Sequence, residues 1–506
     1  MTESSTPPSS IPRLLRDKRI AAAIFLLIAG AILLPIWVVH YPPLLDFPNH
    51  VASTFALAHL HDPAYAFDGY YAGDWGLKPY VATDFLMMEL GKLVPPLVAG
   101  KILLSLGALG LPLGAWFFLR QAHPNEDALA FWFLFIVHNI FFRYGFIGYF
   151  CSMGLMFLTV GLWLRWLKSP LVLRWVLACL AMTATYLTHV FGFFFAAVMI
   201  GLYSLTRPRW REWLWSAALA LPGIIFYFIS SRAAEHQEGG AIFRPLLEKL
   251  PTLALTLHST SMPVDVISFV ALAALLSFGW LRNREFKWDW RWLIVAAGLL
   301  AAYVALPNGY GEGWNVDIRA LPVLFILLFT TASIGKRGWI LVPLALLIFA
   351  ARTYTVTKTF RAAQPEMEGL ARSFAMTPTN ARVLPIVAGN WDEPMNDYFV
   401  HFWAYGVVDR GWLSPYLFEM PGLLPLRIKE DSYTLDGFWE LSYDEPVEWK
   451  GIQADYDYVW GYDVPDRFQP GLHSIGDVIY TSGKLQLFQI DKKKTPAPRL
   501  PPPPQD

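Results

Sequence analysis

The chain contains 506 residues, of which 55% are hydrophobic and 16% are charged, and its formal net charge is zero. Soluble domains carry about 25% charged residues, so this composition excludes an ordinary soluble protein and predicts a mainly α, polytopic helical membrane protein. A net charge of zero creates no overall field that would attract nucleic acid, and we expect no nucleic acid partner. The two cysteines, Cys151 and Cys179, lie inside apolar runs, which predicts neither a disulfide framework nor a thiolate metal site.

The N-terminal segment, residues 1–19, is rich in Ser and Pro and ends in a basic cluster that includes Arg13, Arg16 and Arg19. An apolar run long enough to cross a membrane follows at 20–39, without a small-residue cleavage site. We therefore expect a cytoplasmic N-terminus, a retained first span and no cleavable signal peptide.

About eleven apolar runs are long enough, by a loose count, to span a membrane. They lie at residues 20–39, 98–119, 127–142, 146–167, 172–188, 190–206, 213–231, 263–281, 291–306, 320–334 and 338–354. Lys and Arg are concentrated in the connections on one side, which predicts that this side is cytoplasmic. The odd number of spans then places everything after the membrane domain, residues 20–355, outside the cytoplasm.

The first outer loop, residues 40–97, is long and carries many ionisable side chains, among them Asp46, His50 and Asp84. Its segments 48–61 and 80–95 each have an apolar face at helical spacing, but charged residues interrupt the second one. We expect both segments to be helices that lie in the membrane interface. Asp46 stands just before the first of them, where a carboxylate beside a hydrophobic wall suits a general base for lipid-carried substrates, or alternatively caps the helix.

The region after residue 355 has frequent charges and turn signals. Segments 382–388 and 455–464 and the pair around Ser482-Gly483 are predicted as strands, the last as a hairpin, and segment 365–376 as a helix that starts near Pro365. We expect a small extracytoplasmic α/β domain over residues 356–491 and a disordered, Pro-rich tail over residues 492–506.

Together, these features resemble the polytopic GT-C glycosyltransferases, a group that includes bacterial ArnT-like and protein-mannosyltransferase-like enzymes. The string LLDFPNHVA, which contains Asp46, is similar to an Asp-x-Pro-x-His variant found in bacterial members. The resemblance implies a multi-pass protein of the bacterial inner membrane that transfers a sugar, with inversion, from a polyprenyl-phosphate donor to a glycan, lipid or protein acceptor. It implies that Asp46 is the catalytic carboxylate.

The chain departs from this family at the residue after Asp46, where several members have a second acid and this chain has Phe47. A second carboxylate would have to come from Asp84, Glu89 or Asp74, and the use of a divalent metal is left open. The sequence itself supports no metal site, because His59 and His61 point apart on a helix.

The leaving phosphate needs a cation, and Arg319 is the first candidate, since it follows a glycine-rich loop and enters a span. Its alternatives are contact with lipid headgroups or an ion pair with Asp317. The other candidates for substrate or phosphate contact are Arg143, Arg232, Arg244, His258 and His189, and His50 is a candidate partner of Asp46.

Two other classes of function are open. A transporter or flippase of lipid-linked material would need ionisable residues deep in the spans or repeated halves with broken helices, and neither is evident. A non-catalytic scaffold of envelope assembly would leave Asp46 dispensable. Within the enzymes, a polymer ligase is the runner-up.

Overall fold

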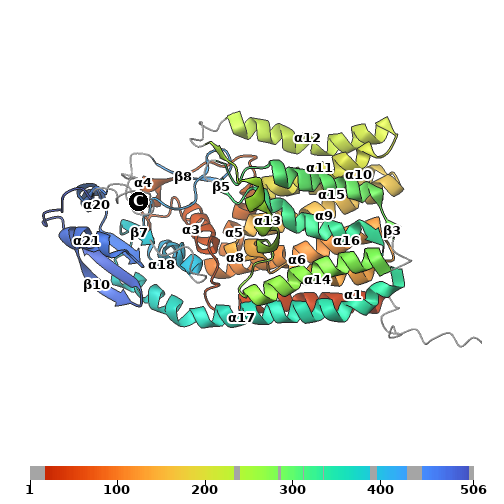
Figure 1. Ribbon diagram of the computed structural model, residues 1–506. Coiled ribbons are helices and arrows are strands. Elements are labelled where there is room, and N and C mark those ends of the chain that lie inside the picture. The colour runs from red at the N-terminus through yellow and green to blue at the C-terminus, as the bar shows by residue number, and fades with distance from the viewer. Residues whose placement is uncertain are drawn as a thin grey trace, which may run out of the picture.

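The structure is a computed structural model of the chain. The structure describes residues 18–232, 240–282, 287–310, 313–333, 335–387, 396–429 and 447–500. Most of them are helical, and long helices lie side by side in one layered bundle, with a small sheet beyond one end (Figure 1).

Within the described residues, five helical segments are long and apolar enough to cross a membrane. They are Arg19–Trp37, Pro96–Ala122, Ile147–Lys168, Trp210–Ser230 and Gly338–Met376. Their principal helices are α1 (Lys18–Gly30), α6 (Pro96–Ala122), α9 (Ile147–Lys168), α12 (Trp210–Arg232) and α17 (Val342–Arg372). Shorter apolar helices fill the bundle, namely α10 (Val172–Thr188), α11 (Val190–Leu205), α14 (Met262–Arg282), α15 (Trp290–Ala305) and α16 (Leu321–Thr330). The helical membrane architecture expected from the apolar runs is confirmed, and the number of spans stays a prediction.

Helices α6 and α9 pack with their backbones in contact. A Cβ atom added at Gly114 would lie 2.3 Å from the carbonyl oxygen of Gly154, and one added at Gly154 would meet the backbone of Gly110. Small residues of this kind let helices approach closely where no hydrophobic effect drives them together.

The segment 127–142 was predicted to be one span, and this prediction is wrong. The structure has α7 (Ala130–Ile136) and α8 (Ile140–Tyr144), separated by an irregular segment at His138. The side chain of Asn139 accepts hydrogen bonds from the amides of Phe141 and Phe142, so it caps α8 and starts a new helix inside the apolar run.

The first loop forms the two expected helices, α3 (Phe47–Ala58) and α5 (Val81–Gly91), with α4 (Phe67–Tyr70) and β1 (Tyr71–Gly73) between them. Helix α5 leaves Phe85 and Leu86 about half exposed, as suits an interfacial helix. Helix α3 is almost entirely buried, because η8 (Phe402–Ala404) and α18 (Tyr405–Arg410) from the C-terminal region pack against it.

A second small sheet orders the other loops at this end of the bundle. Strand β2 (Ala241–Ile242) pairs with β4 (Gly309–Tyr310), which pairs with β5 (Gly313–Trp314). Helix α13 (Leu246–Leu255) follows β2, and η4 (Asp317–Ala320) follows β5. These elements tie together two loops that the sequence leaves far apart.

Helix α17 continues without a break from the bundle to the sheet (Figure 1). The helix expected to start near Pro365 is therefore wrong at its beginning, since Pro365 lies inside α17. Phe360, Ala363 and Met367 are each 1% exposed, and this burial on both sides offsets the cost of about 3 kcal/mol for an internal proline. The predicted boundary between residues 355 and 356 falls inside this helix, and the division into domains stays a prediction.

The C-terminal region forms a four-stranded sheet in the order β10-β11-β9-β7. Strands β7 (Val383–Val387), β9 (Tyr458–Tyr462), β10 (Gly476–Ser482) and β11 (Leu485–Ile490) match the predicted strands and hairpin. Helices α20 (Trp449–Asp455) and α21 (Gln469–Ile475) accompany them. Strand β8 (Leu426–Ile428) is not part of this sheet and pairs with β1 of the first loop.

Part of the tail predicted to be disordered is ordered in the structure. Lys492 donates hydrogen bonds to the carbonyl oxygens of Ala454 and Tyr456, and Leu500 pairs with Val447. These backbone contacts hold residues 492–500 against the domain, whereas residues 501–506 lie outside the described part of the chain.

Candidate functional site

Asp46 occupies the N-cap position of α3, but its side chain makes no capping hydrogen bond. Its backbone amide donates to the carbonyl oxygen of Tyr144 at 2.8 Å, and the amide of Leu45 donates to the carbonyl oxygen of Arg143 at 3.2 Å. The backbone is thus fixed to the turn after α8, while the carboxylate is left available for another role.

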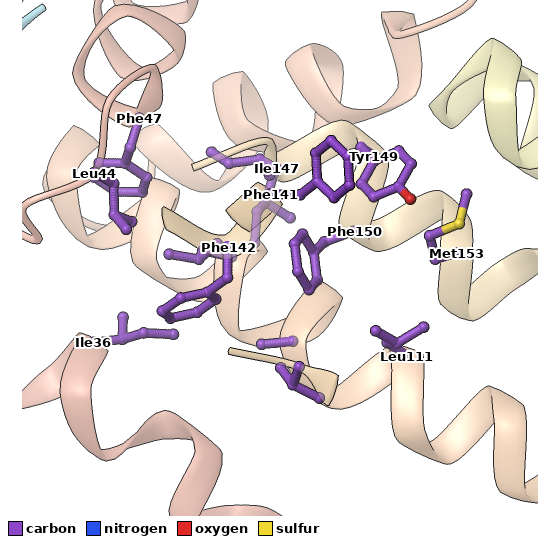
Figure 2. Close-up of a cluster of buried hydrophobic side chains, with 14 of the residues drawn as sticks. Ile36, Leu44, Phe47, Leu111, Phe141, Phe142, Ile147, Tyr149, Phe150 and Met153 are labelled. Carbon is purple, nitrogen blue, oxygen red and sulfur yellow. The ribbon is translucent and has the colours of Figure 1, made fainter. Parts of the chain in front are cut away.

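The turn that holds Asp46 depends on Gly145, which has a φ of +71°. A Cβ atom there would lie 2.9 Å from Cβ of Phe47 and 3.1 Å from Cβ of Leu44. Figure 2 shows Leu44 and Phe47 at one side of a buried apolar cluster that includes Phe141 and Phe142. Residues on both sides of Asp46 in the sequence therefore belong to a buried apolar cluster.

The Asp46 carboxylate is 17% exposed and has a histidine within 4 Å. Nε2 of His401 lies 3.5 Å from Oδ1 of Asp46. Burial raises the pKa of Asp46 to about 7, and the positive charge of Arg319 lowers it in part. A carboxyl group with such a pKa exchanges protons near neutral pH, which is what a general base requires.

His50, Phe418 and His401 form an aromatic wall beside Asp46. The ring centroid of Phe418 lies 5.2 Å from that of His50 and 5.1 Å from that of His401, both in edge-to-face geometry. Burial lowers the pKa of His50 to about 4 and that of His401 to about 3. Both imidazoles are therefore neutral at neutral pH.

The C-terminal segment that carries His401 and Phe418 is fastened to the first loop. The side chain of Asn49, which is 0% exposed, donates to the carbonyl oxygen of Tyr416 and accepts from the amide of Phe418, both at 2.8 Å. The hydroxyl of Tyr71 bonds to the backbone of Ser414, and β1 pairs with β8. Residues 414–428, which include Phe418 beside His401, are therefore held against the first loop by several contacts.

Arg319 is buried next to this carboxylate and is not paired with Asp317. One terminal nitrogen donates to the carbonyl oxygen of Trp314 at 3.0 Å, and the other lies 3.5 Å from Nε2 of His189. Its Nε atom is buried and has no hydrogen-bond partner among the described residues. The guanidinium thus keeps a positive charge and donor capacity for an anion.

Aromatic rings enclose the Arg319 guanidinium. The centroids of Phe146 and Phe191 lie 5.0 and 4.9 Å from its central carbon, within the range of cation–π attraction. Tyr80 places its ring 4.4 Å from that of His189, and its hydroxyl bonds to Arg319. This cage orients the guanidinium without neutralising it.

Asp317 is instead paired with two cations from the loop before α14. Its Oδ2 lies 3.1 Å from Nζ of Lys249 and 3.5 Å from one terminal nitrogen of Arg244, whose other terminal nitrogen donates to the side-chain oxygen of Asn308 at 2.6 Å. The Asp317 side chain is 0% exposed. These ion pairs hold η4, which also contains Arg319, against α13.

Two of the three acids considered as a second carboxylate are already paired. Asp74 interacts with Lys78 and Arg427, and Glu89 pairs with Lys92 at 2.6 Å on the surface. Asp84 has no hydrogen bond or ion pair from its side chain to any described residue, and burial raises its pKa to about 7. No contact joins it to Asp46 in the described part of the chain.

The remaining candidates are spread over the structure. The guanidinium of Arg143 lies 5.5 Å from the ring of Tyr398, close to the backbone that holds Asp46. His258 lies in a separate buried cluster, where its Nδ1 is 3.0 Å from Asp265. The side chain of Arg232 lies outside the described part of the structure.

The described residues include no group of three or more His, Cys, Asp or Glu side chains that could hold a metal ion. The donor set around Asp46 consists of one carboxylate and two histidines that flank a phenylalanine ring, which does not match the oxygen-rich shell of a hard divalent cation. We therefore derive no chemical step through a metal.

Sequence reasoning missed His401, Phe418, Tyr80 and the caging phenylalanines. The one local signal is that Phe146 and Phe191 follow the candidates Arg143 and His189 closely in sequence. Nothing in the sequence near His401 indicates that it meets the first loop.

No protein-family model and no curated protein matches this chain. Its structure is similar to ArnT from Cupriavidus metallidurans in the apo state, with a TM-score of 0.51 and 12% identity, over 94% of this chain and 99% of that one. The same ArnT bound to undecaprenyl phosphate gives a TM-score of 0.51 and 11% identity, over 94% of this chain and 98% of that one. Arabinofuranosyltransferase AftD from Mycobacteria gives a TM-score of 0.45 and 14% identity over 95% of this chain and 42% of that chain, and adds nothing to the assignment. This chain therefore has the membrane fold of ArnT, a GT-C-like fold.

Proposed function

We propose that this protein is a membrane glycosyltransferase that transfers a sugar from a polyprenyl-phosphate donor to an acceptor hydroxyl, with inversion. The observation that carries the proposal is the presence of two groups near each other in an ArnT-like fold. They are the Asp46 carboxylate, which makes no capping hydrogen bond, and the caged guanidinium of Arg319, whose charge acts on it.

The proposed reaction is a single displacement. Asp46 removes the proton from the acceptor hydroxyl as its oxygen attacks the anomeric carbon. The bond from that carbon to the phosphate oxygen breaks, and the polyprenyl phosphate leaves with the bonding electrons. The proton stays on Asp46, whose raised pKa makes it a stronger base than an exposed aspartate.

Arg319 stabilises the negative charge that develops on the leaving phosphate. Arg319 forms no ion pair with Asp317, which is paired with Lys249, and aromatic rings shield its guanidinium from water. Its attraction for the phosphate is therefore strong. The ArnT structure with undecaprenyl phosphate supports a polyprenyl phosphate as the lipid partner.

The same proposal places the protein in the bacterial inner membrane with its N-terminus in the cytoplasm. The first loop and the C-terminal region then lie on the periplasmic side, where a lipid-linked sugar meets a glycan, lipid or protein acceptor. The distribution of Lys and Arg between the loops supports this orientation.

Native mass spectrometry of lipids that co-purify with the protein tests the proposal. We expect the wild type to carry polyprenyl phosphate and the Asp46→Asn variant to retain a polyprenyl phosphate with a sugar-sized additional mass, because binding persists while transfer stops. Arg319→Met should lose the lipid, whereas Arg319→Lys, which keeps a positive charge, should keep part of it.

Asp68→Asn is the matched control, because Asp68 lies in the same loop and is exposed. It should behave like the wild type. Absence of any polyprenyl lipid from every variant, or the same lipid profile for Asp46→Asn and the wild type, would overturn the proposal.

A further inference from the structure

The C-terminal region contributes a side chain to the candidate site. His401 lies between η7 (Asn396–Phe399) and η8, after the last membrane helix, yet its Nε2 atom is 3.5 Å from the Asp46 carboxylate. The side chains of both residues are less than one-fifth exposed. The two polar groups are therefore close enough to interact in a largely desolvated environment.

The position of His401 is fixed independently of Asp46. Its ring packs edge-on against Phe418, and Phe418 is held by the buried side chain of Asn49. Asn49 is also part of α3, the helix that begins directly after Asp46. One helix therefore sets the position of both the carboxylate and its imidazole partner.

The tautomer of His401 follows from its surroundings. Its Nδ1 atom is buried and has no hydrogen-bond partner among the described residues. Since the ring is neutral at neutral pH, it carries one proton, and placing that proton on Nε2 lets it donate to the carboxylate. In this tautomer the protonated Nε2 lies 3.5 Å from one oxygen of Asp46, and the other oxygen remains for the acceptor hydroxyl.

We propose that His401 is a positioning residue for Asp46, which orients the carboxylate and stabilises its ionised form, so that the C-terminal region completes the site. This inference rests on the proposed role of Asp46 as general base. The charged and titratable groups near Asp46 are His401 and Arg319, together with His50, which interacts with His401, and His189, which lies 3.5 Å from Arg319.

Labelling with dicyclohexylcarbodiimide tests the proposal, because this reagent modifies protonated buried carboxyl groups. The fraction of Asp46 labelled in the full-length protein is measured by peptide mass spectrometry across a series of pH values. In the wild type it should fall with a midpoint near pH 7, following the pKa of Asp46.

His401→Phe keeps a ring and removes the N–H donor, so the midpoint should move upward by about one pH unit. His401→Gln keeps a donor and should move it by less than half as much. His473→Phe makes the same exchange on the exposed surface of the C-terminal region and should leave the midpoint unchanged.

Asp84, which also has a raised pKa, is labelled in the same samples and reports whether the first loop remains folded. An unchanged Asp46 midpoint in a folded His401→Phe variant would overturn the proposal, and so would equal shifts for the Phe and Gln variants. Labelling needs no turnover, so these outcomes are separate from loss of polyprenyl phosphate binding, which would overturn the proposed function instead.

Discussion

The buried pair between Lys249 and Asp317 makes a quantitative prediction about how Arg319 is held. The Lys249 side chain is 4% exposed and that of Asp317 is 0% exposed, and their charged atoms are 3.1 Å apart. The Lys249 ammonium also donates to the carbonyl oxygens of Tyr303 and Leu306 at 2.9 Å. Lys249→Met keeps the length of the side chain and removes all three interactions.

Removing one partner of a buried ion pair costs about 3–5 kcal/mol, because the other charge stays buried. We expect Lys249→Met to cost about 3 kcal/mol, at the lower end, since Arg244 still faces Asp317 at 3.5 Å. Asp317→Asn should cost less, about 1–2 kcal/mol, because Lys249 keeps its two carbonyl partners. The double variant should cost less than the sum, with a coupling of about 1–2 kcal/mol.

The free energy of unfolding in mixed detergent micelles provides the measurement. Lys92→Met is the control, because Lys92 forms a surface pair with Glu89 and such pairs contribute about 0–1 kcal/mol. Undecaprenyl phosphate should also bind more weakly to Lys249→Met, since η4 carries both Asp317 and Arg319. Strictly additive single changes, or equal costs for Lys249→Met and Lys92→Met, would refute this reasoning.

Two further predictions concern Asp46 directly. The rate of sugar transfer in membranes should rise with pH through about 7, because burial raises the pKa of Asp46 and the base must be ionised. In Arg319→Met, which should lose the donor lipid, the midpoint of Asp46 labelling by dicyclohexylcarbodiimide should move to higher pH, since the charge of Arg319 lowers that pKa. A rate independent of pH between about 6 and 8 would contradict this. Gly145→Ala should lower the free energy of unfolding by about 2 kcal/mol or more and reduce sugar transfer, because Gly145 has a positive φ and an added Cβ atom would contact Phe47. Gly201→Ala is the control and should be neutral or stabilising, because its added Cβ atom would meet no atom within 4 Å. Equal effects of the two changes would contradict the role of this turn.

Elements that depend on local sequence were largely predictable. Apolar runs match the helices α6, α9 and α10 closely, and the two helices of the first loop follow from apolar faces at helical spacing. The hairpin around Gly483 follows from its turn residues. Each of these predictions uses residues that are close together in the sequence, and their pattern indicates directly which face is buried or where the backbone turns.

Two predicted helix boundaries were wrong, one at Asn139 and one at Pro365. Asn139 looks like one polar residue in a span, but it caps α8. Pro365 looks like a helix start, but burial of its helical neighbours carries α17 through it. At Pro365 contacts with distant elements outweighed the local preference, whereas at Asn139 a local capping hydrogen bond outweighed the apolar pattern.

The sequence by itself determined that the chain is a helical membrane protein, that Asp46 stands at the start of a helix beside an apolar wall, and that Arg319 enters the bundle from a loop. Only the tertiary structure decided what surrounds these two residues. It paired Asp317 with Lys249 and so left Arg319 its charge, and it brought His401 to Asp46 through contacts such as that of Asn49 with Tyr416, which are 367 residues apart. The physical reason is that a single sequence records which residues are buried, whereas the partner of a buried polar group depends on how distant segments pack.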